Sequence, residues 1–131
     1  DNIEKVLKTM RRNTKKPISL KLRKSPQALD IAKLAEKYCD IIAIHPRTLD
    51  QGYSGEPDYE FALKLRDSVK IPVIYSGNVD ETNIERALLD FPFVFIGYRT
   101  ELILSPVIRC ASNSGLRTVI CLPTRRAMIL E

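Results

Sequence analysis

The stretch Asp40-Ile41-Ile42-Ala43-Ile44-His45 decides the fold class, because it is a nearly continuous apolar run with a polar residue at each end. A run of this kind is typical of a parallel strand that is covered on both faces. On its amino-terminal side, a helix-like segment at residues 2–12 precedes a strand-like segment at residues 17–22, whose proline stands at the strand start. Helix-like and strand-like segments therefore alternate around this run.

The same alternation continues towards the carboxyl end. Two more strands are predicted, at residues 71–75 and 93–96. The intervening helices are expected to start at Ser25-Pro26, at Pro57 and at an Asp80 cap. Strand starts about 20 to 30 residues apart have the pitch of βα units with parallel strands, in an open sheet or in a (β/α)8 barrel. The fold class is therefore α/β, and 131 residues are far fewer than the roughly 250 of a complete barrel.

Composition limits the kinds of protein that this chain can be. The chain contains 44% hydrophobic residues and carries a formal net charge of +5. That apolar content is ordinary for a globular protein. No apolar run approaches the ~20 residues of a membrane-spanning helix, and the first residues are polar, so we expect neither a membrane anchor nor a secretory leader. The positive charge permits a polyanionic partner but does not identify one.

The three cysteines predict neither a disulfide framework nor a structural zinc site. Cys39, Cys110 and Cys121 are odd in number and far apart, and the chain has one histidine. Both kinds of site need paired or clustered ligands. We therefore expect these cysteines to act as small apolar residues, no metal site, and a cytoplasmic protein.

Polar residues and glycines follow each predicted strand, where ligands of parallel α/β sheets bind. Lys21 stands near the end of the first strand, and His45-Pro46-Arg47-Thr48 ends the second. Ser76-Gly77-Asn78 follows the third strand and Gly97-Tyr98 the fourth. A lysine, an imidazole and two glycine turns suit an anion such as a phosphate. Taken singly, the lysine could be a solvated edge charge, the histidine could be structural, and each glycine could serve only a turn.

Four segments resemble the tRNA-dihydrouridine synthases in order and spacing, over about residues 1–108. The H-x-R-T-x-x-Q-x-Y-x-G run is the most specific of them, because related flavin barrels such as dihydroorotate dehydrogenases lack it. Residues 109–131 match no element of the family and are expected to be a divergent or truncated tail. The matching segments are Pro17–Arg23, His45–Gly55, Ile71–Val79 and Phe95–Gly97.

The resemblance implies the second half of a TIM-type (β/α)8 barrel from an FMN-dependent oxidoreductase. Members of the family use NADPH to reduce the uracil C5=C6 bond in tRNA, and a helical tRNA-binding domain follows their barrel. Here Lys21 and His45 would lie along the flavin ring and its ribityl chain. The FMN phosphate would be held by backbone groups of Ser76, Gly77, Asn78, Gly97 and Tyr98. The substrate uridine would be held by a loop with Arg47, Gln51 and Tyr53.

Two departures from the family pattern concern catalysis and phosphate binding. The family's proton donor is a cysteine in an N-x-G-C-P turn, and this sequence contains no such turn. We therefore expect this chain alone not to reduce uridine. The family also shows I-G-R-G-A after the last barrel strand, whereas Ile96-Gly97-Tyr98-Arg99-Thr100 stands here, with Tyr98 in the usual arginine position.

Two other functions remain open at this point, together with the question of partners. The chain could belong to another FMN-binding or phosphate-binding barrel enzyme, such as a dihydroorotate dehydrogenase-like reductase. It could also be a non-catalytic remnant or an interaction module. Half of a barrel leaves two sheet edges and an apolar inner face uncovered, which favours a homodimer or pairing with a missing amino-terminal half-barrel. The expected macromolecular partner is tRNA, without a membrane.

Overall fold

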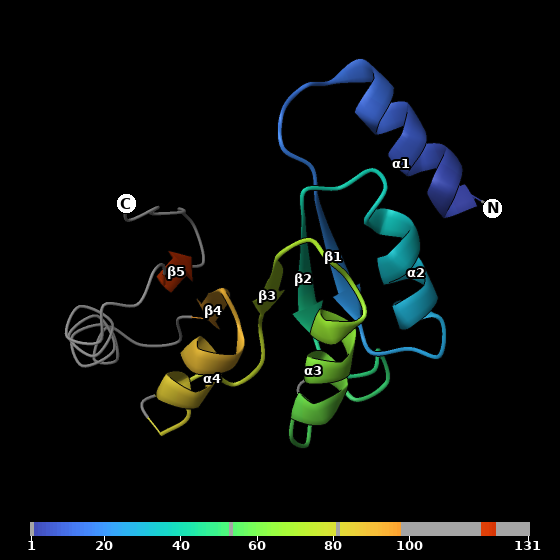
Figure 1. Cartoon of the computed structure of the whole chain (residues 1–131). Coiled ribbons are helices and arrows are strands. Elements are labelled where there is room, and N and C mark those ends of the chain that lie inside the picture. The colour runs from blue at the N-terminus through green and yellow to red at the C-terminus, as the bar shows by residue number, and fades with distance from the viewer. Residues whose placement is uncertain (1, 53, 81, 98–118, 123–131) are drawn as a thin grey trace. The chain divides into compact units, whose positions relative to one another are not determined.

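The computed structural model describes residues 2–52, 54–80, 82–97 and 119–122 (Figure 1). The chain divides into two compact units, Asp1–Val73 and Ile74–Glu131, and each unit is described by itself. Within the described ranges, no helix has both the length and the apolar character needed to cross a membrane. The predicted boundary at residue 108 lies outside the described residues.

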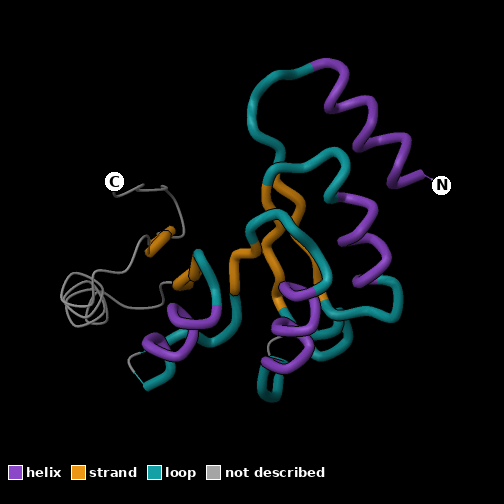
Figure 2. The backbone as a smooth tube through the Cα atoms, viewed as in Figure 1, coloured by secondary structure: helices purple, strands orange, loops and turns teal. Residues whose placement is uncertain are grey.

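Helices and strands alternate from α1 to β4, as predicted (Figure 2). The strands pair in parallel in both units, so the α/β class is confirmed, with the element order of part of a TIM barrel. The strand β3, Val73–Tyr75, begins where the first unit ends. The first unit otherwise contains α1 (Asn2–Asn13), β1 (Ser19–Arg23), α2 (Ala28–Ala35), β2 (Ile41–His45) and α3 (Tyr59–Asp67), and the second contains α4 (Ile84–Asp90), β4 (Phe93–Gly97) and β5 (Val119–Leu122).

The pairing of β1 with β2 sorts their side chains onto two faces. Ser19 pairs with Ile41 and Arg23 with His45, and side chains alternate between the faces along each strand. Ile42 and Ile44 are fully buried on one face of the pair. Helix α2 also contacts β1. The other face is more exposed along both strands. This asymmetry leaves one face of the β1–β2 pair accessible to a ligand or another chain.

Helices α2, α3 and α4 begin two or three residues later than predicted, because other residues close their first turns, whereas α1 begins at Asn2 as predicted. α2 begins after Gln27, while the Ala28 N–H donates to the Ser25 carbonyl at 3.1 Å. At α3 the cap is Asp58, whose side chain accepts from the Phe61 N–H at 2.9 Å, rather than the preceding Pro57. Serine and proline signals therefore placed the helices correctly but not their first residues.

The predicted Asp80 cap of α4 is wrong for the same kind of reason. The residue at the N-cap position is Asn83, whose side-chain oxygen accepts from the Asp80 N–H at 3.1 Å. The Asp80 carboxylate instead accepts from the Thr82 N–H at 2.8 Å. Asp80 and Asn83 thus close a turn in front of the helix.

The second unit has its own small apolar core. Tyr75 of β3 stacks on Phe91 with ring centroids 5.1 Å apart. Val94 of β4 is fully buried, as expected for a strand inside a parallel sheet. β4 pairs in parallel with β3 and with β5, which falls within residues 109–131, the segment expected to be a divergent or truncated tail. α4 contributes the buried side chains Ile84, Ala87 and Leu88.

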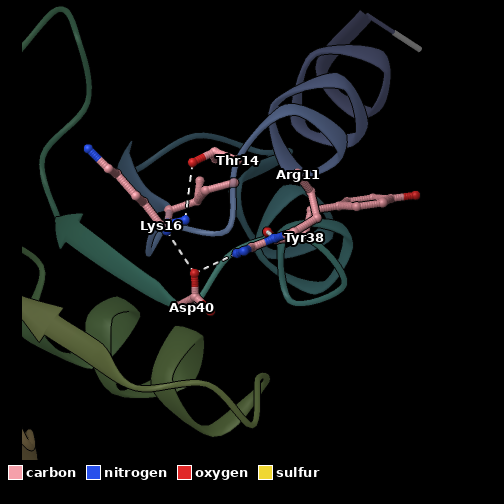
Figure 3. Close-up of polar contacts among 6 residues, drawn as sticks. Arg11, Thr14, Lys16, Tyr38 and Asp40 are labelled. Atoms are coloured by element: carbon pink, nitrogen blue, oxygen red, sulfur yellow. Dashed lines mark hydrogen bonds and ion pairs between the residues drawn. The ribbon is translucent and has the colours of Figure 1, made fainter.

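A polar clamp fastens α1 to the starts of β1 and β2 (Figure 3). Asp40 accepts from the Arg11 guanidinium at 2.5 Å and from the Ile18 N–H at 2.7 Å. Arg11 also donates to the Tyr38 carbonyl at 2.8 Å, and the Tyr38 hydroxyl donates to Glu4 at 2.9 Å. The Ile18 N–H, followed by the Arg11 side chain, lowers the pKa of Asp40 below its ordinary value of 3.8. The carboxylate therefore joins a helix to both strands.

We expect Asp40→Asn to destabilise the chain in a pH-dependent way. Because the pKa of Asp40 is lower in the folded chain, its stabilisation is complete above the unfolded value and is lost as the pH falls through the folded value. Chemical unfolding should therefore show a constant stability difference from wild type above about pH 5, shrinking below about pH 4. The exposed Asp30→Asn in α2 is the control, and its effect should be at most half as large. A pH-independent difference would contradict this reading of the clamp.

Candidate cofactor and substrate site

Lys21 and His45 lie on the same, more exposed face of the β1–β2 pair. Lys21 pairs with Ala43, and Arg23 pairs with His45. On this face of β2, His45 is therefore the next residue after Ala43, towards the carboxyl end. Lys21 is exposed, and His45 is half-buried with its Nε2 atom out of contact with solvent. The register thus places an amine and an imidazole on neighbouring strands, near the carboxyl ends of both. This is the part of a parallel α/β fold in which ligands bind.

The loop that follows β2 is closed by its own polar side chains. The Thr48 N–H donates to the Gln51 side-chain oxygen at 2.9 Å, and the Gln51 N–H donates to the Thr48 hydroxyl at 3.3 Å. Gly52 has φ +55° and Gly55 has φ +65°, a region that favours glycine. The T-x-x-Q-G spacing of the motif therefore has a local structural cause.

Arg47 is buried beneath this loop, with 2% of its surface exposed. Its Nε donates to the Gly55 carbonyl at 3.0 Å, and its Nη2 donates to the same oxygen. The Arg47 carbonyl also accepts from the Lys24 N–H at 3.1 Å. The side chain thus ties the far end of the loop to its beginning, while the backbone ties the loop to the residue after β1. In this position Arg47 holds the shape of the loop.

Two residues that sequence reasoning missed fix the base of the loop. Lys24 and Asp58 form an ion pair with a 2.6 Å separation, and the Lys24 ammonium lies 5.8 Å from the centroid of the Phe61 ring. The Lys24 hydrogen bond, followed by that of the Phe61 N–H, lowers the pKa of Asp58. The Asp58 N–H donates to the Pro46 carbonyl at 2.8 Å. An Asp after a proline at the start of a helical pattern was the available sequence signal.

Three of the predicted phosphate-binding residues lie in a tight turn of the second unit. Ser76 and Gly77 directly follow β3 and are buried, whereas Asn78 is exposed with φ +45°. The Asn78 carbonyl accepts from the Asn83 side chain at 2.8 Å, which closes the turn. Gly97 is the last residue of β4. Gly77 has no side chain, and Asn78 has left-handed backbone angles. The backbone N–H groups of this turn can therefore come close to a ligand at the carboxyl end of β3.

The remaining predicted residues are only partly covered by the described ranges. Tyr53 and Tyr98 lie outside the described residues. Cys39 is buried in the first unit, and burial raises the pKa of its thiol, as expected of an apolar role. In the described part of the chain, no group of three or more His, Cys, Asp or Glu side chains is placed to hold a metal ion.

Comparisons with known proteins give a consistent result. The profile of the family described as dihydrouridine synthase (Dus) matches residues 1–91. The probable tRNA-dihydrouridine synthase of Rickettsia bellii is 34% identical over 89 residues, which cover 63% of this chain and 27% of that protein. The tRNA-dihydrouridine synthases B of Yersinia pestis and Vibrio cholerae are 33% and 35% identical over 98 residues, each covering 70% of this chain and 30% of the relative.

This chain spans less than a third of the length of these relatives. The profile match ends at Phe91, before β4, so the resemblance seen in the sequence beyond that residue lies outside it. Within the match lie both strands of the first unit and the loop held by Arg47. The chain therefore belongs to the dihydrouridine synthase family.

Proposed function

We propose that this chain is the FMN-binding part of a cytoplasmic tRNA-dihydrouridine synthase. The observation that carries the proposal is the shared face of Lys21 and His45, set by the register of β1 and β2. The family match and the tRNA-dihydrouridine synthases among the relatives support the reaction class, an oxidoreduction of uridine in tRNA. When bound, FMN would supply the two-electron chemistry for the uracil C5=C6 bond, with NADPH as the reductant.

The residues of the first unit fit a flavin by their chemistry. Lys21 is an exposed ammonium on a strand face that also carries Ser19, Arg23, Ile41, Ala43 and His45. An ammonium near the N1–C2=O edge of a flavin stabilises negative charge on the ring. His45, on the next strand, is placed to donate or accept a hydrogen bond along the ribityl chain. The small side chain of Ala43 between them leaves room for a flat ring against the strands.

The residues of the second unit fit a phosphate by their backbone. Buried Gly77 brings no side chain to the edge after β3, and Ser76 and Asn78 flank it. Backbone N–H groups in a turn with a left-handed residue bind anions. We therefore assign the FMN phosphate to Ser76, Gly77, Asn78, Gly97 and Tyr98.

The loop held by Arg47 is proposed to cover the pocket for the target uridine. Its buried guanidinium is turned to the Gly55 carbonyl, so we propose that Arg47 positions the loop instead of contacting the base. Gln51 closes the same loop through Thr48. Tyr53 lies between these anchors in the sequence and is the remaining candidate for contact with the uridine.

The catalytic acid is proposed to come from outside this chain. No N-x-G-C-P turn occurs in the sequence, and Cys39 is buried with a raised pKa, which does not suit a proton donor to substrate. The chain also spans only 27% to 30% of the three relatives compared above. We therefore propose that residues of an amino-terminal half-barrel complete the site.

FMN binding to the full chain tests this proposal. We expect saturable quenching of flavin fluorescence, and Lys21→Ala and His45→Ala should each weaken binding about tenfold, equivalent to ~1.4 kcal/mol. Lys33→Ala, which removes an exposed lysine from α2, is the matched control and should bind as wild type.

Two results from this experiment bear on the proposal in different ways. Absence of FMN binding by the folded chain would favour the reading as a non-catalytic remnant. Dihydrouridine formed in tRNA by the FMN-loaded chain with NADPH would show that the chain needs no external acid, against the preceding argument.

Arg47→Ala is expected to lower the free energy of unfolding by about 1–3 kcal/mol, because it removes buried hydrogen bonds to the Gly55 carbonyl. Arg47→Lys should recover little, since an ammonium lacks the planar guanidinium donors. The exposed Arg86→Ala in α4 is the control, with a change within ~0.5 kcal/mol. Urea unfolding measures all three. An Arg47→Ala variant as stable as wild type would contradict the anchoring role.

We also propose that the isolated chain forms a homodimer through its open strand face when no second half-barrel is present. Uncovered strand faces and edges favour association. Analytical ultracentrifugation at micromolar concentration should show a concentration-dependent dimer. A monomer over the whole range would contradict the homodimer proposal.

A further inference from the structure

The positive charge of the chain is concentrated in its first helix and the segment after it. Residues 1–16 contain six basic and two acidic residues, a net charge of +4, whereas the remaining residues contain 15 basic and 14 acidic ones. Such segregation of one sign of charge is the electrostatic footprint of a polyanion-binding surface.

Five of these basic residues are exposed and form what we name the α1 cationic row. Lys5, Lys8 and Arg12 stand at i, i+3 and i+7 of α1, which places them within about 60° of arc and along ~10 Å of the helix axis. Lys15 and Lys16 continue the row between α1 and β1. All five side chains are exposed, and within the described ranges none of them forms an ion pair with an acidic residue.

The sixth basic residue, Arg11, does not belong to the row. It faces the protein and is bound to Asp40 and to the Tyr38 carbonyl (Figure 3). Leu7, on the same side of α1, is buried. The clamp therefore fixes the rotation of the helix about its own axis, and the cationic row is held away from the core.

The geometry of α1 distinguishes among polyanionic partners. Its exposed apolar residues Ile3, Val6 and Met10 are also at i, i+3 and i+7, but they lie about 160° around the helix from the row. A helix that lies on a membrane inserts its apolar side with its cations beside it at the headgroups. Here the row points almost directly away from the apolar stripe, so a membrane that took up the apolar residues would leave the row in solvent. A polyanion that contacts the row alone fits better.

The row also lies at the opposite end of the strands from the candidate site. α1 leads into the amino end of β1, whereas the loop held by Arg47 follows the carboxyl end of β2. A five-residue strand is ~16 Å long. A small nucleotide at the site would not reach the row, whereas an extended RNA could.

We propose that the α1 cationic row binds the phosphate backbone of the RNA substrate at a distance from the reacting uridine. This inference rests on the proposed function and adds a second contact surface to it. Lysines and arginines on a helix that contact phosphates position a nucleic acid without reading its sequence. The row should therefore contribute affinity and salt dependence, but no preference for a particular base.

Fluorescence anisotropy with an unmodified tRNA transcript tests the proposal on the full chain. The row variant K8Q/R12Q/K15Q/K16Q removes four charges, and the matched control K33Q/K37Q/K64Q/K70Q removes four exposed lysines elsewhere. Each phosphate contact contributes about 0.7 to 0.9 to the slope of log affinity against log salt, so the row variant should lose about 3 from that slope between about 50 and 200 mM salt. Its affinity should fall at least tenfold, and that of the control less than threefold.

Equal losses in the two variants would overturn the proposal, because general charge would then explain the binding. It would also be overturned if the row variant lost binding to phosphatidylserine vesicles or to polyglutamate but not to the transcript. Circular dichroism checks folding, and K15Q/K16Q, outside the helix, gives the same test with half the effect if the larger variant unfolds.

FMN titration of the same samples separates this proposal from the preceding one. A chain that fails to bind FMN and shows row-dependent RNA binding would contradict the flavin site and support the row. A chain that binds FMN and whose RNA affinity is indifferent to the row would do the reverse.

Discussion

Parallel pairing of β1 with β2 in a single register is the constraint on which the candidate site depends. Because side chains alternate along a strand, a slip of one residue would move Lys21 and His45 to opposite faces. The register is held from the other side, where Ile42 and Ile44 are fully buried, because a slip of one residue would put Ala43 and His45 in their places. At the amino ends of the strands, Asp40 adds a polar clamp through Ile18 and Arg11. Apolar burial and the clamp together therefore determine where the amine and the imidazole stand.

In the loop after β2, side chains of the sequence motif form hydrogen bonds that hold the loop itself. Arg47 looks like a ligand for an anion when it is read beside His45, yet its guanidinium is turned inward to the Gly55 carbonyl. Thr48 and Gln51 bind each other's backbone N–H groups, and Gly55 supplies a backbone angle that other residues rarely adopt. A family can thus require such residues because they present a rigid loop, while contact with substrate falls to fewer side chains.

Much of the fold could be predicted from the sequence, because burial on both faces leaves a strong apolar signal in strands such as β2. The candidate site could be predicted only as far as strand ends indicate where ligands bind. Lys21 and His45 were chosen as candidates in this way. Helix starts were misplaced because the capping residue was chosen by type: Asp80 was expected to cap α4 but binds Thr82 in the preceding turn. The Lys24–Asp58 pair could not be foreseen, since it joins residues 34 apart through the fold.

Whether Lys21 and His45 share a ligand-binding face can be decided by chemical-shift mapping of the ¹⁵N-labelled chain during FMN titration. We expect progressive shifts of amides at the carboxyl ends of β1 and β2, with cross-strand contacts that match the Lys21–Ala43 and Arg23–His45 pairs. Amides of α1, at the other end of these strands, should not move. Shifts confined to α1, or strand contacts in a register displaced by one residue, would contradict a shared ligand-binding face.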